Sequence, residues 1–200
     1  MKEINIALVA HDGRKKELID WVKFNWKMLA KYNIWATGTT GRLISELVIE
    51  EEGKLIRPFE KKVTRLFSGP LGGDQQIGAM IAEQKINMLI FFCDNLIVQG
   101  HQNDVSALTR LAALYNIAFA TNRTTADMLL TSPLVDDPEY SIELPDCIAS
   151  YANRSLKYAF LSSHAADCFP ARITDLRNSS SIIIRAKSTN IYKPYLLTII

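Results

Sequence analysis

The chain has 200 residues, of which 48% are hydrophobic and 22% charged, and 23 basic residues stand against 21 acidic ones. This length and composition predict one globular domain with a substantial core. A net charge of +2 gives no electrostatic basis for a protein that coats nucleic acid or binds a membrane surface, so any anion site must be local.

The cysteines and the first residues of the chain both indicate in which cellular compartment the protein works. Cys93, Cys147 and Cys168 are too few and too far apart for a disulfide framework, and no CxxC pair suggests zinc. The first residues lack the apolar run of a signal peptide, and no later segment has the roughly 18 consecutive apolar residues of a membrane span. These features predict a cytoplasmic protein without a membrane segment.

Short apolar runs alternate with helix-length segments along most of the chain. Strands are expected at residues 4–10, 33–36, 63–67, 88–93 and 117–121, and helices at residues 15–32, 42–50, 75–84, 104–115 and 122–130. In the first helix, Leu18, Val22, Trp26 and Leu29 recur at helical spacing and form one apolar stripe. The alternation predicts an α/β fold, a three-layer α/β/α arrangement with a mainly parallel central sheet, whose ligands lie beyond the carboxyl ends of the strands.

Two regions do not follow this rhythm. Residues 50–62 have mixed charges and no clear period, and we expect an irregular connection there. Beyond about residue 157 the alternation is lost, and only "SIIIR" resembles a strand. The sequence therefore predicts a domain over residues 1–157 and a C-terminal extension of unknown structure over residues 158–200.

The run "TGTTG" lies between a predicted strand and a predicted helix. Hydroxyls and glycines at a helix N-terminus expose side-chain donors and backbone N–H groups that can hold a phosphate. Lys15 would add a positive charge. In the loop after the next predicted strand, Ser68 would add a hydroxyl and Gly69 a flexible backbone amide. The candidate phosphate-binding residues are Lys15, Thr37, Gly38, Thr39, Thr40, Ser68 and Gly69. The alternative is an ordinary N-cap, in which Thr39 or Thr40 satisfies free helical amides.

The stretch "FSGPLGGDQQ" places three glycines and a proline ahead of one carboxylate, Asp74. Clustered glycines usually mark a tight turn or a backbone that must approach something closely. Asp74 is therefore either a general base close to a bound substrate or the N-cap of the helix that follows.

A third cluster, "CDNLIVQGHQND", follows a predicted strand and sets Asp94 and Asp104 on either side of His101. A carboxylate can fix the tautomer of an imidazole and raise its pKa, so this group suits acid–base chemistry. His11 is expected at the same edge of the sheet. The spacing matches no common metal-ligand pattern, so we expect no metal site. Together the three clusters suit proton abstraction next to a carbonyl in a small phosphorylated metabolite.

The motifs "IALVAHDGRK", "ATGTTGRLI", "SGPLGGDQQIGAMI", "LIFFCDNL" with its downstream His and Asp, and "ATNRTTADMLL" resemble those of methylglyoxal synthases, in order and at the expected separations. The resemblance covers roughly residues 4–154. It departs at Asn95, where members of the family often have proline.

The resemblance implies conversion of dihydroxyacetone phosphate to methylglyoxal and inorganic phosphate without a metal or organic cofactor. Asp74 would be the base, His101 with Asp104 would handle the protons of the enediol oxygens, and His11 and Asp94 would position the substrate. The seven phosphate-binding candidates named above fall on the family's phosphate positions. The family also implies a homohexamer. Inhibition by phosphate is expected because the product would occupy the same site, and Arg110 and Arg154 are candidate subunit-contact residues.

Two other functions stay open at this point. Domains of this kind also serve as effector-binding regulatory domains of carbamoyl phosphate synthetase, which need the phosphate site but not the base. A phosphosugar isomerase would use the same substrate but would form glyceraldehyde 3-phosphate instead of releasing phosphate. Retention of Asp74, His101 and Asp104 favours the synthase.

Overall fold

The computed structural model describes residues 3–97, 100, 102–148 and 150–151. All of them belong to the first of two compact units, Met1–Asn153, the second being Arg154–Ile200. The predicted extension lies outside the described residues, so its boundary at residue 157 stays a prediction. Within the described part of the chain, no helix is both long and apolar enough to cross a bilayer.

A five-stranded sheet forms the centre of this unit, in the order β5-β2-β1-β6-β7. Its strands are β1 (Asn5–Ala10), β2 (Asn33–Thr37), β5 (Val63–Leu66), β6 (Met88–Phe92) and β7 (Ala118–Ala120). All neighbouring strands are parallel, and Ile6 of β1 pairs with Ile34 on one side and Met88 on the other. The predicted parallel sheet is confirmed.

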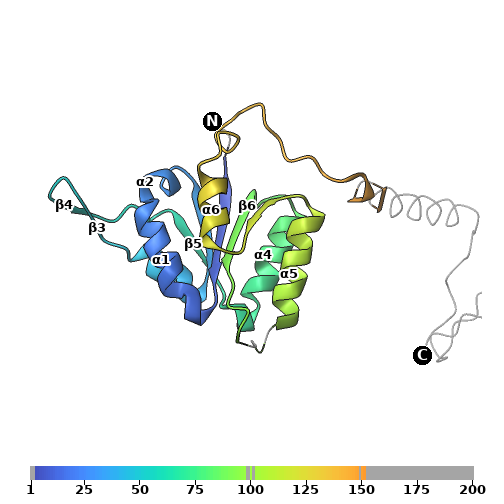
Figure 1. Cartoon of the computed structure of the whole chain (residues 1–200), viewed down its shortest axis with the longest axis horizontal. Helices are drawn as coiled ribbons and strands as arrows, with labels where there is room; N and C mark the ends of the chain where they lie inside the picture. Colours follow the sequence, from blue (N-terminus) through green and yellow to red (C-terminus); the bar gives the residue numbers. More distant parts are fainter. Residues whose placement is uncertain (1–2, 98–99, 101, 149, 152–200) are drawn as a thin grey trace, which may run out of the picture. The chain divides into compact units, whose positions relative to one another are not determined.

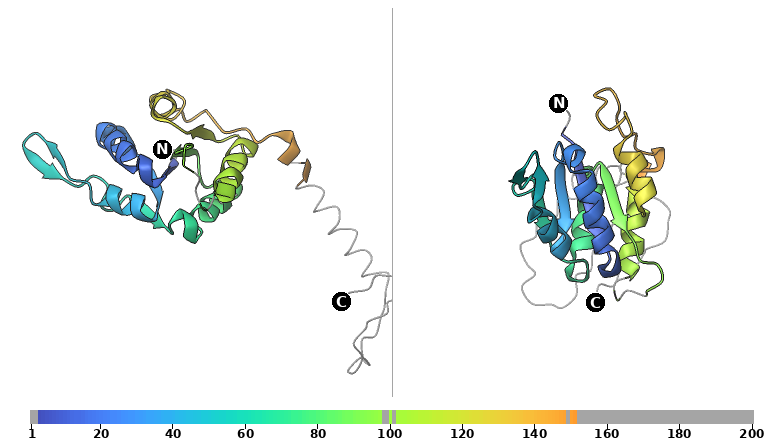
Figure 2. Two further views of the ribbon diagram at one scale, coloured as in Figure 1. Left: turned by 60° about the horizontal axis from the view of Figure 1, so that its bottom comes forward. Right: turned by 60° about the vertical axis from the view of Figure 1, so that its left-hand side comes forward.

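Side chains of β1 alternate between the two faces of the sheet and enter separate hydrophobic cores. Ile6 and Leu8 pack in one core with residues of α1 and α6, whereas Ala7 and Val9 pack in the other with residues of α4 and α5. The helices are α1 (Lys15–Phe24), α4 (Gly73–Ala82), α5 (Gln102–Leu114) and α6 (Arg123–Leu130). Figures 1 and 2 show the two helix layers on opposite sides of the sheet, as predicted.

Two of the predicted helices differ most from the structure in their bounds. The first is divided at Asn25 into α1 and the short α2 (Trp26–Leu29), and the side-chain amide of Asn25 donates to the carbonyl of Trp21 at 3.2 Å. The second, α3 (Gly38–Ser45), begins inside "TGTTG" and ends before the predicted residue 50.

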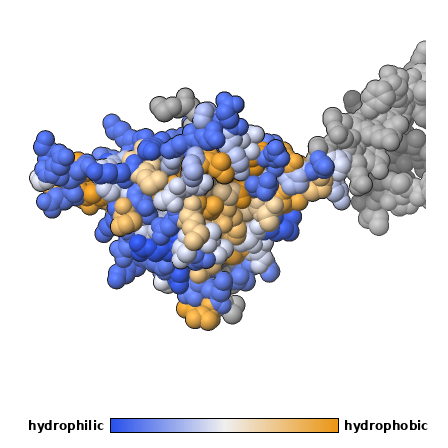
Figure 3. Space-filling view, turned by 45° about the horizontal axis from the view of Figure 1, so that its top comes forward, coloured by the Kyte–Doolittle hydropathy of each residue, from blue (hydrophilic) through white to orange (hydrophobic). Residues whose placement is uncertain are grey.

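The region expected to be an irregular connection contains a β-hairpin, so that expectation was wrong. Strands β3 (Ile49–Glu51) and β4 (Lys54–Ile56) pair antiparallel around Glu52 and Gly53, both at positive φ. Positive φ at both turn residues matches the twist of a hairpin. The hairpin projects from the sheet (Figure 1), and Lys27 of α2 pairs with Glu51 at 2.7 Å. Figure 3 shows one face of the molecule, largely hydrophilic with hydrophobic residues near its middle.

Candidate active site

A cavity of about 620 Å³ lies at the carboxyl ends of the strands. It is the place where parallel α/β sheets bind ligands, because the loops after several strands converge there. The structure brings nine of the predicted site residues to its wall: His11, Lys15, Thr37, Thr39, Thr40, Ser68, Gly69, Asp74 and Asp104. Residues that are far apart in the sequence therefore share one cavity.

The hydroxyl-rich wall of the cavity is the first turn of α3. Thr37 is its N-cap, and no side chain caps the helix, so the prediction of Thr39 or Thr40 as an ordinary cap was wrong. Thr37 and Thr40 are 5% and 1% exposed. Within the described part of the chain, the Thr40 hydroxyl has no hydrogen-bond partner. This turn can therefore offer both backbone N–H groups and hydroxyls to an anion.

Two glycines hold the loop after β5 against the helices on either side of it. The N–H of Gly38 donates to the carbonyl of Phe67 at 3.1 Å, and a Cβ at Gly38 would lie 2.9 Å from Cα of Ser68. A Cβ at Gly73 would lie only 2.1 Å from the carbonyl oxygen of Phe67. Gly38 is not among the lining residues, and it instead lets Ser68 approach the start of α3.

Asp74 is the second residue of α4, whose N-cap is Gly72 at φ 100°. The prediction of Asp74 as a helix cap was therefore wrong, and its carboxylate instead lies in the cavity wall, only 2% exposed. The loop that precedes it is held by Gln76, whose side-chain oxygen accepts the N–H of Phe67 at 2.8 Å. The glycines thus bring a buried carboxylate beside the hydroxyl-rich turn.

His11 follows β1, and only 5% of it is exposed. Its Nδ1 accepts a hydrogen bond from the backbone N–H of Asp94 at 2.8 Å, and its ring packs edge-on against Phe91, with centroids 4.9 Å apart. Asp94 itself is not among the lining residues, and its Oδ1 accepts the N–H of Leu96 at 3.2 Å. The backbone N–H of Asp94 therefore contacts a residue of the cavity wall, whereas Asp94 itself does not line the cavity.

The third predicted cluster is described in part. Asp104 lies in the first turn of α5 and in the cavity wall. His101 lies outside the described residues. Sequence reasoning missed Asp12, which lines the cavity and contacts the ammonium of Lys15. Its position beside His11, three residues before Lys15, was the signal available for finding it.

Cys93 directly follows β6 and lies near these charged groups. Burial raises the pKa of the Cys93 thiol to about 11, while the Arg14 guanidinium lowers that pKa and the Asp74 carboxylate raises it. The thiol is therefore neutral at physiological pH, and a neutral thiol is a poor nucleophile. Among the described residues there is also no group of three or more His, Cys, Asp or Glu side chains that could hold a metal ion.

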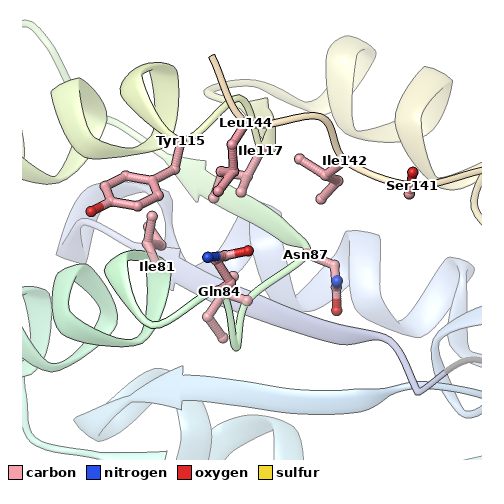
Figure 4. A pocket seen from close by; sticks show the side chains of 9 residues that line it. Ile81, Gln84, Asn87, Tyr115, Ile117, Ser141, Ile142 and Leu144 are labelled. Carbon is pink, nitrogen blue, oxygen red and sulfur yellow. The ribbon is translucent and has the colours of Figure 1, made fainter. Parts of the chain in front are cut away.

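A second cavity, of about 170 Å³, lies where β6 and β7 begin. Figure 4 shows Tyr115, Ile117, Ile142 and Leu144 on one side of it and Ile81, Gln84 and Asn87 on the other. None of the predicted site residues lines it. Of these two cavities, only the larger one is lined by predicted site residues that the structure describes.

Comparison with known proteins gives consistent results. A family model described as "MGS-like domain" matches residues 17–121. The chain is 51% identical to the methylglyoxal synthase of Maridesulfovibrio salexigens over 76% of its own length and 97% of that protein. It is also 51% identical to the methylglyoxal synthase of Proteus mirabilis, over 72% of its own length and 87% of that protein. A crystal structure of methylglyoxal synthase from Elizabethkingia anophelis superimposes with a TM-score of 0.61 at 43% identity, covering 72% of this chain and 86% of that one.

Proposed function

Because the chain belongs to the methylglyoxal synthase family, we propose that it converts dihydroxyacetone phosphate to methylglyoxal and inorganic phosphate. It is accordingly a lyase that acts on a phosphate-containing substrate. The observation that carries the proposal is the buried carboxylate of Asp74 in the same cavity as Lys15 and the hydroxyls of the α3 turn. A base and an anion site side by side suit a small phosphorylated ketone.

The phosphate group would bind at the first turn of α3. Backbone N–H groups there point out of the helix, and the helix dipole favours an anion. Thr39, Thr40 and Ser68 add hydroxyl donors, and Lys15 adds a positive charge. The Thr40 hydroxyl, buried and without a partner in the described part of the chain, supports this placement because a buried donor normally has an acceptor.

Asp74 would take a proton from the carbon that bears the substrate hydroxyl. The C–H bond breaks, the proton goes to the carboxylate, and the electron pair forms the C=C bond of an enediolate. Exclusion of water matters at this step, because hydrogen bonds and charges act more strongly in a dry site. The 2% exposure of Asp74 meets that condition.

Phosphate leaves in the second step. The proton of the substrate hydroxyl passes to the other enediolate oxygen, the electrons left on the first oxygen form an aldehyde C=O bond, and the C=C electrons shift along the chain as the C–O bond breaks with its electron pair on the phosphate. The product is the enol of methylglyoxal, which becomes the ketone by gaining a proton at its terminal carbon and losing the proton of its enol oxygen. Elimination requires the C–O bond to stand perpendicular to the enediolate plane, and donors on the phosphate can hold that geometry.

Asp104 and His101 would move protons between the oxygens of the enediolate. Asp104 lies in the cavity wall, in the first turn of α5. The role of His101 is carried over from the resemblance of the sequence motif. Product phosphate would occupy the same hydroxyl-rich turn as the substrate phosphate, so we also propose inhibition by phosphate. We also propose a homohexamer, as the family implies, and a cytoplasmic location, which the cysteine usage favours.

The test is turnover of dihydroxyacetone phosphate by the purified full chain, with methylglyoxal and phosphate measured together. Asp74→Asn is expected to lower kcat by about 10²- to 10⁴-fold, as for the loss of a general base. Binding of a phosphate-bearing substrate analogue to this variant, measured by calorimetry, should be preserved. The matched control is Asp20→Asn, which removes the charge of an exposed carboxylate on α1.

Different outcomes separate the alternatives. A folded wild-type protein that binds the analogue but forms neither product would favour an effector-binding domain. Glyceraldehyde 3-phosphate as the main product would favour an isomerase. Equal loss of turnover and binding in Asp74→Asn would indicate that Asp74 has a structural role only.

A further inference from the structure

Phe67 lies between the end of β5 and Ser68, which lines the larger cavity. Its carbonyl accepts the N–H of Gly38, the first residue of α3, at 3.1 Å. Its own N–H donates to the side-chain oxygen of Gln76, on α4, at 2.8 Å. The backbone of Phe67 therefore joins the helix of the hydroxyl-rich turn to the helix that carries the buried carboxylate.

The loop after Phe67 also rests on the start of α4 through its backbone. The carbonyl of Ser68 accepts the N–H of Gly73 at 3.0 Å. A Cβ at Gly73 would lie only 2.1 Å from the carbonyl oxygen of Phe67. These contacts join backbone atoms, whereas Gln76 contributes a side chain. A substitution of Gln76 can therefore remove one link of the loop to α4 and leave the others in place.

We propose that Gln76 is a positioning residue: by holding the N–H of Phe67, it fixes Ser68 and the bound phosphate relative to Asp74, so that the enediolate loses phosphate and does not take its proton back. The inference rests on the function proposed above. Gln76 is not among the residues that line the cavity, so it acts through the loop and not on the substrate.

The enediolate has competing fates that differ in what they require of the phosphate. Elimination requires the C–O bond to phosphate to stand perpendicular to the enediolate plane. Return of the proton to the first carbon restores dihydroxyacetone phosphate, and delivery to the neighbouring carbon gives glyceraldehyde 3-phosphate. Neither of these two steps needs that alignment. A loop that holds the phosphate in place therefore favours elimination alone.

Asp74 itself does not depend on the side chain of Gln76 for its place. It lies on α4, two residues before Gln76, and so moves with the helix and not with the loop. Loss of the Gln76 contact should therefore leave the abstraction of the proton largely intact and slow the departure of phosphate. The enediolate would then return its proton more often before phosphate leaves.

Two variants of Gln76 separate its acceptor oxygen from its bulk. Gln76→Met keeps the length of the side chain with only a weak acceptor, whereas Gln76→Glu keeps an acceptor oxygen. The full chain is incubated with dihydroxyacetone phosphate in heavy water to partial conversion. Deuterium in the recovered substrate and glyceraldehyde 3-phosphate are then measured relative to methylglyoxal. We expect this ratio to rise about 3- to 10-fold in Gln76→Met and to stay within about twofold of the parent in Gln76→Glu.

A lower kcat in Gln76→Met with an unchanged ratio would show a structural role only and overturn the proposal. An equal rise in both variants would also overturn it, because the acceptor would then not be the cause. Thermal unfolding and the affinity for inorganic phosphate control for folding. If Gln76→Met fails to fold, Gln76→Asn replaces it, because its amide is one methylene too short for the contact, and the same rise is expected. A parent protein that forms no methylglyoxal would overturn the proposed function and this inference together, whereas an active parent with an unchanged ratio in the variants would overturn this inference alone.

Discussion

Lys15 contacts the carboxylate of Asp12, three residues before it, at the entrance of the larger cavity. The Lys15 side chain is 24% exposed and that of Asp12 is 92% exposed. A phosphate that binds Lys15 must therefore compete with a carboxylate that the chain itself supplies. When phosphate dissociates from the protein, the Asp12 carboxylate can pair with the Lys15 ammonium again.

Asp12→Asn is therefore expected to tighten the binding of inorganic phosphate. An exposed ion pair contributes about 0.2–1 kcal/mol, so the expected gain is about 1.5- to 5-fold in affinity, and added salt should reduce it. Phosphate inhibition measured at two salt concentrations checks this. Asp20→Asn changes the net charge equally and should leave the affinity unaltered. Weaker phosphate binding in Asp12→Asn would show that Asp12 helps to hold the anion.

Tyr32 gives a prediction for pH. Burial, and then the hydrogen bond from its hydroxyl to Oδ1 of Asp136 at 2.8 Å, hold the pKa of Tyr32 well above its usual value. Above about pH 10 the unfolded chain releases this proton while the folded chain keeps it, so the free energy of unfolding falls as pH rises. Urea unfolding at pH 8 and pH 11 should show the fall. In Tyr32→Phe the free energy of unfolding should fall less between these two pH values. An equal fall in the variant would show that other groups cause the pH dependence.

At the scale of elements, α1 is tied to α6 by one carboxylate. Oδ1 of Asp127 accepts the indole N–H of Trp21 at 2.6 Å and lies 3.4 Å from the side-chain amide of Asn25. Trp21 is fully buried in the core, so its N–H has no access to water. The carboxylate of α6 thus satisfies a donor that the packing of α1 requires.

Asp127→Ala is expected to lower the free energy of unfolding by about 1–3 kcal/mol, the cost of leaving a buried donor without a partner. Urea denaturation measures the change. Asp20→Ala, which removes an exposed carboxylate from α1, is the control and should stay within about 0.5 kcal/mol of the parent. If Asp127→Ala combined with Trp21→Phe were as unstable as the sum of the two single variants, the contact would carry no energy.

At the scale of the whole molecule, both hydrophobic cores are built from described residues between Ile4 and Ile142. A chain ending at residue 157 is therefore expected to fold and to keep turnover of dihydroxyacetone phosphate within about threefold of the full chain, because it retains every core residue that the structure describes. Thermal unfolding, the turnover assay and light scattering of both chains check this. Loss of turnover together with loss of the larger assembly would assign the residues beyond 157 to subunit contacts.

Much of the fold follows from local patterns. "MLIFF" is entirely apolar, and as β6 it is buried on both faces. The hairpin of β3 and β4 was missed because its strands are short and half of its residues are charged, so that the turn at Glu52 and Gly53 is its clearest mark. The division of the first helix at Asn25 was missed because the apolar stripe continues past it.

The sequence by itself determined the alternation of strands and helices, the family, and nine residues of the cavity wall. These depend on periodicity and on short motifs, which are local. Only the tertiary structure decided that Asp74 lies inside its helix and in the wall, and that the backbone N–H of Asp94 meets Nδ1 of His11. Such roles depend on which atoms meet across 83 residues of chain, and no local pattern records that distance.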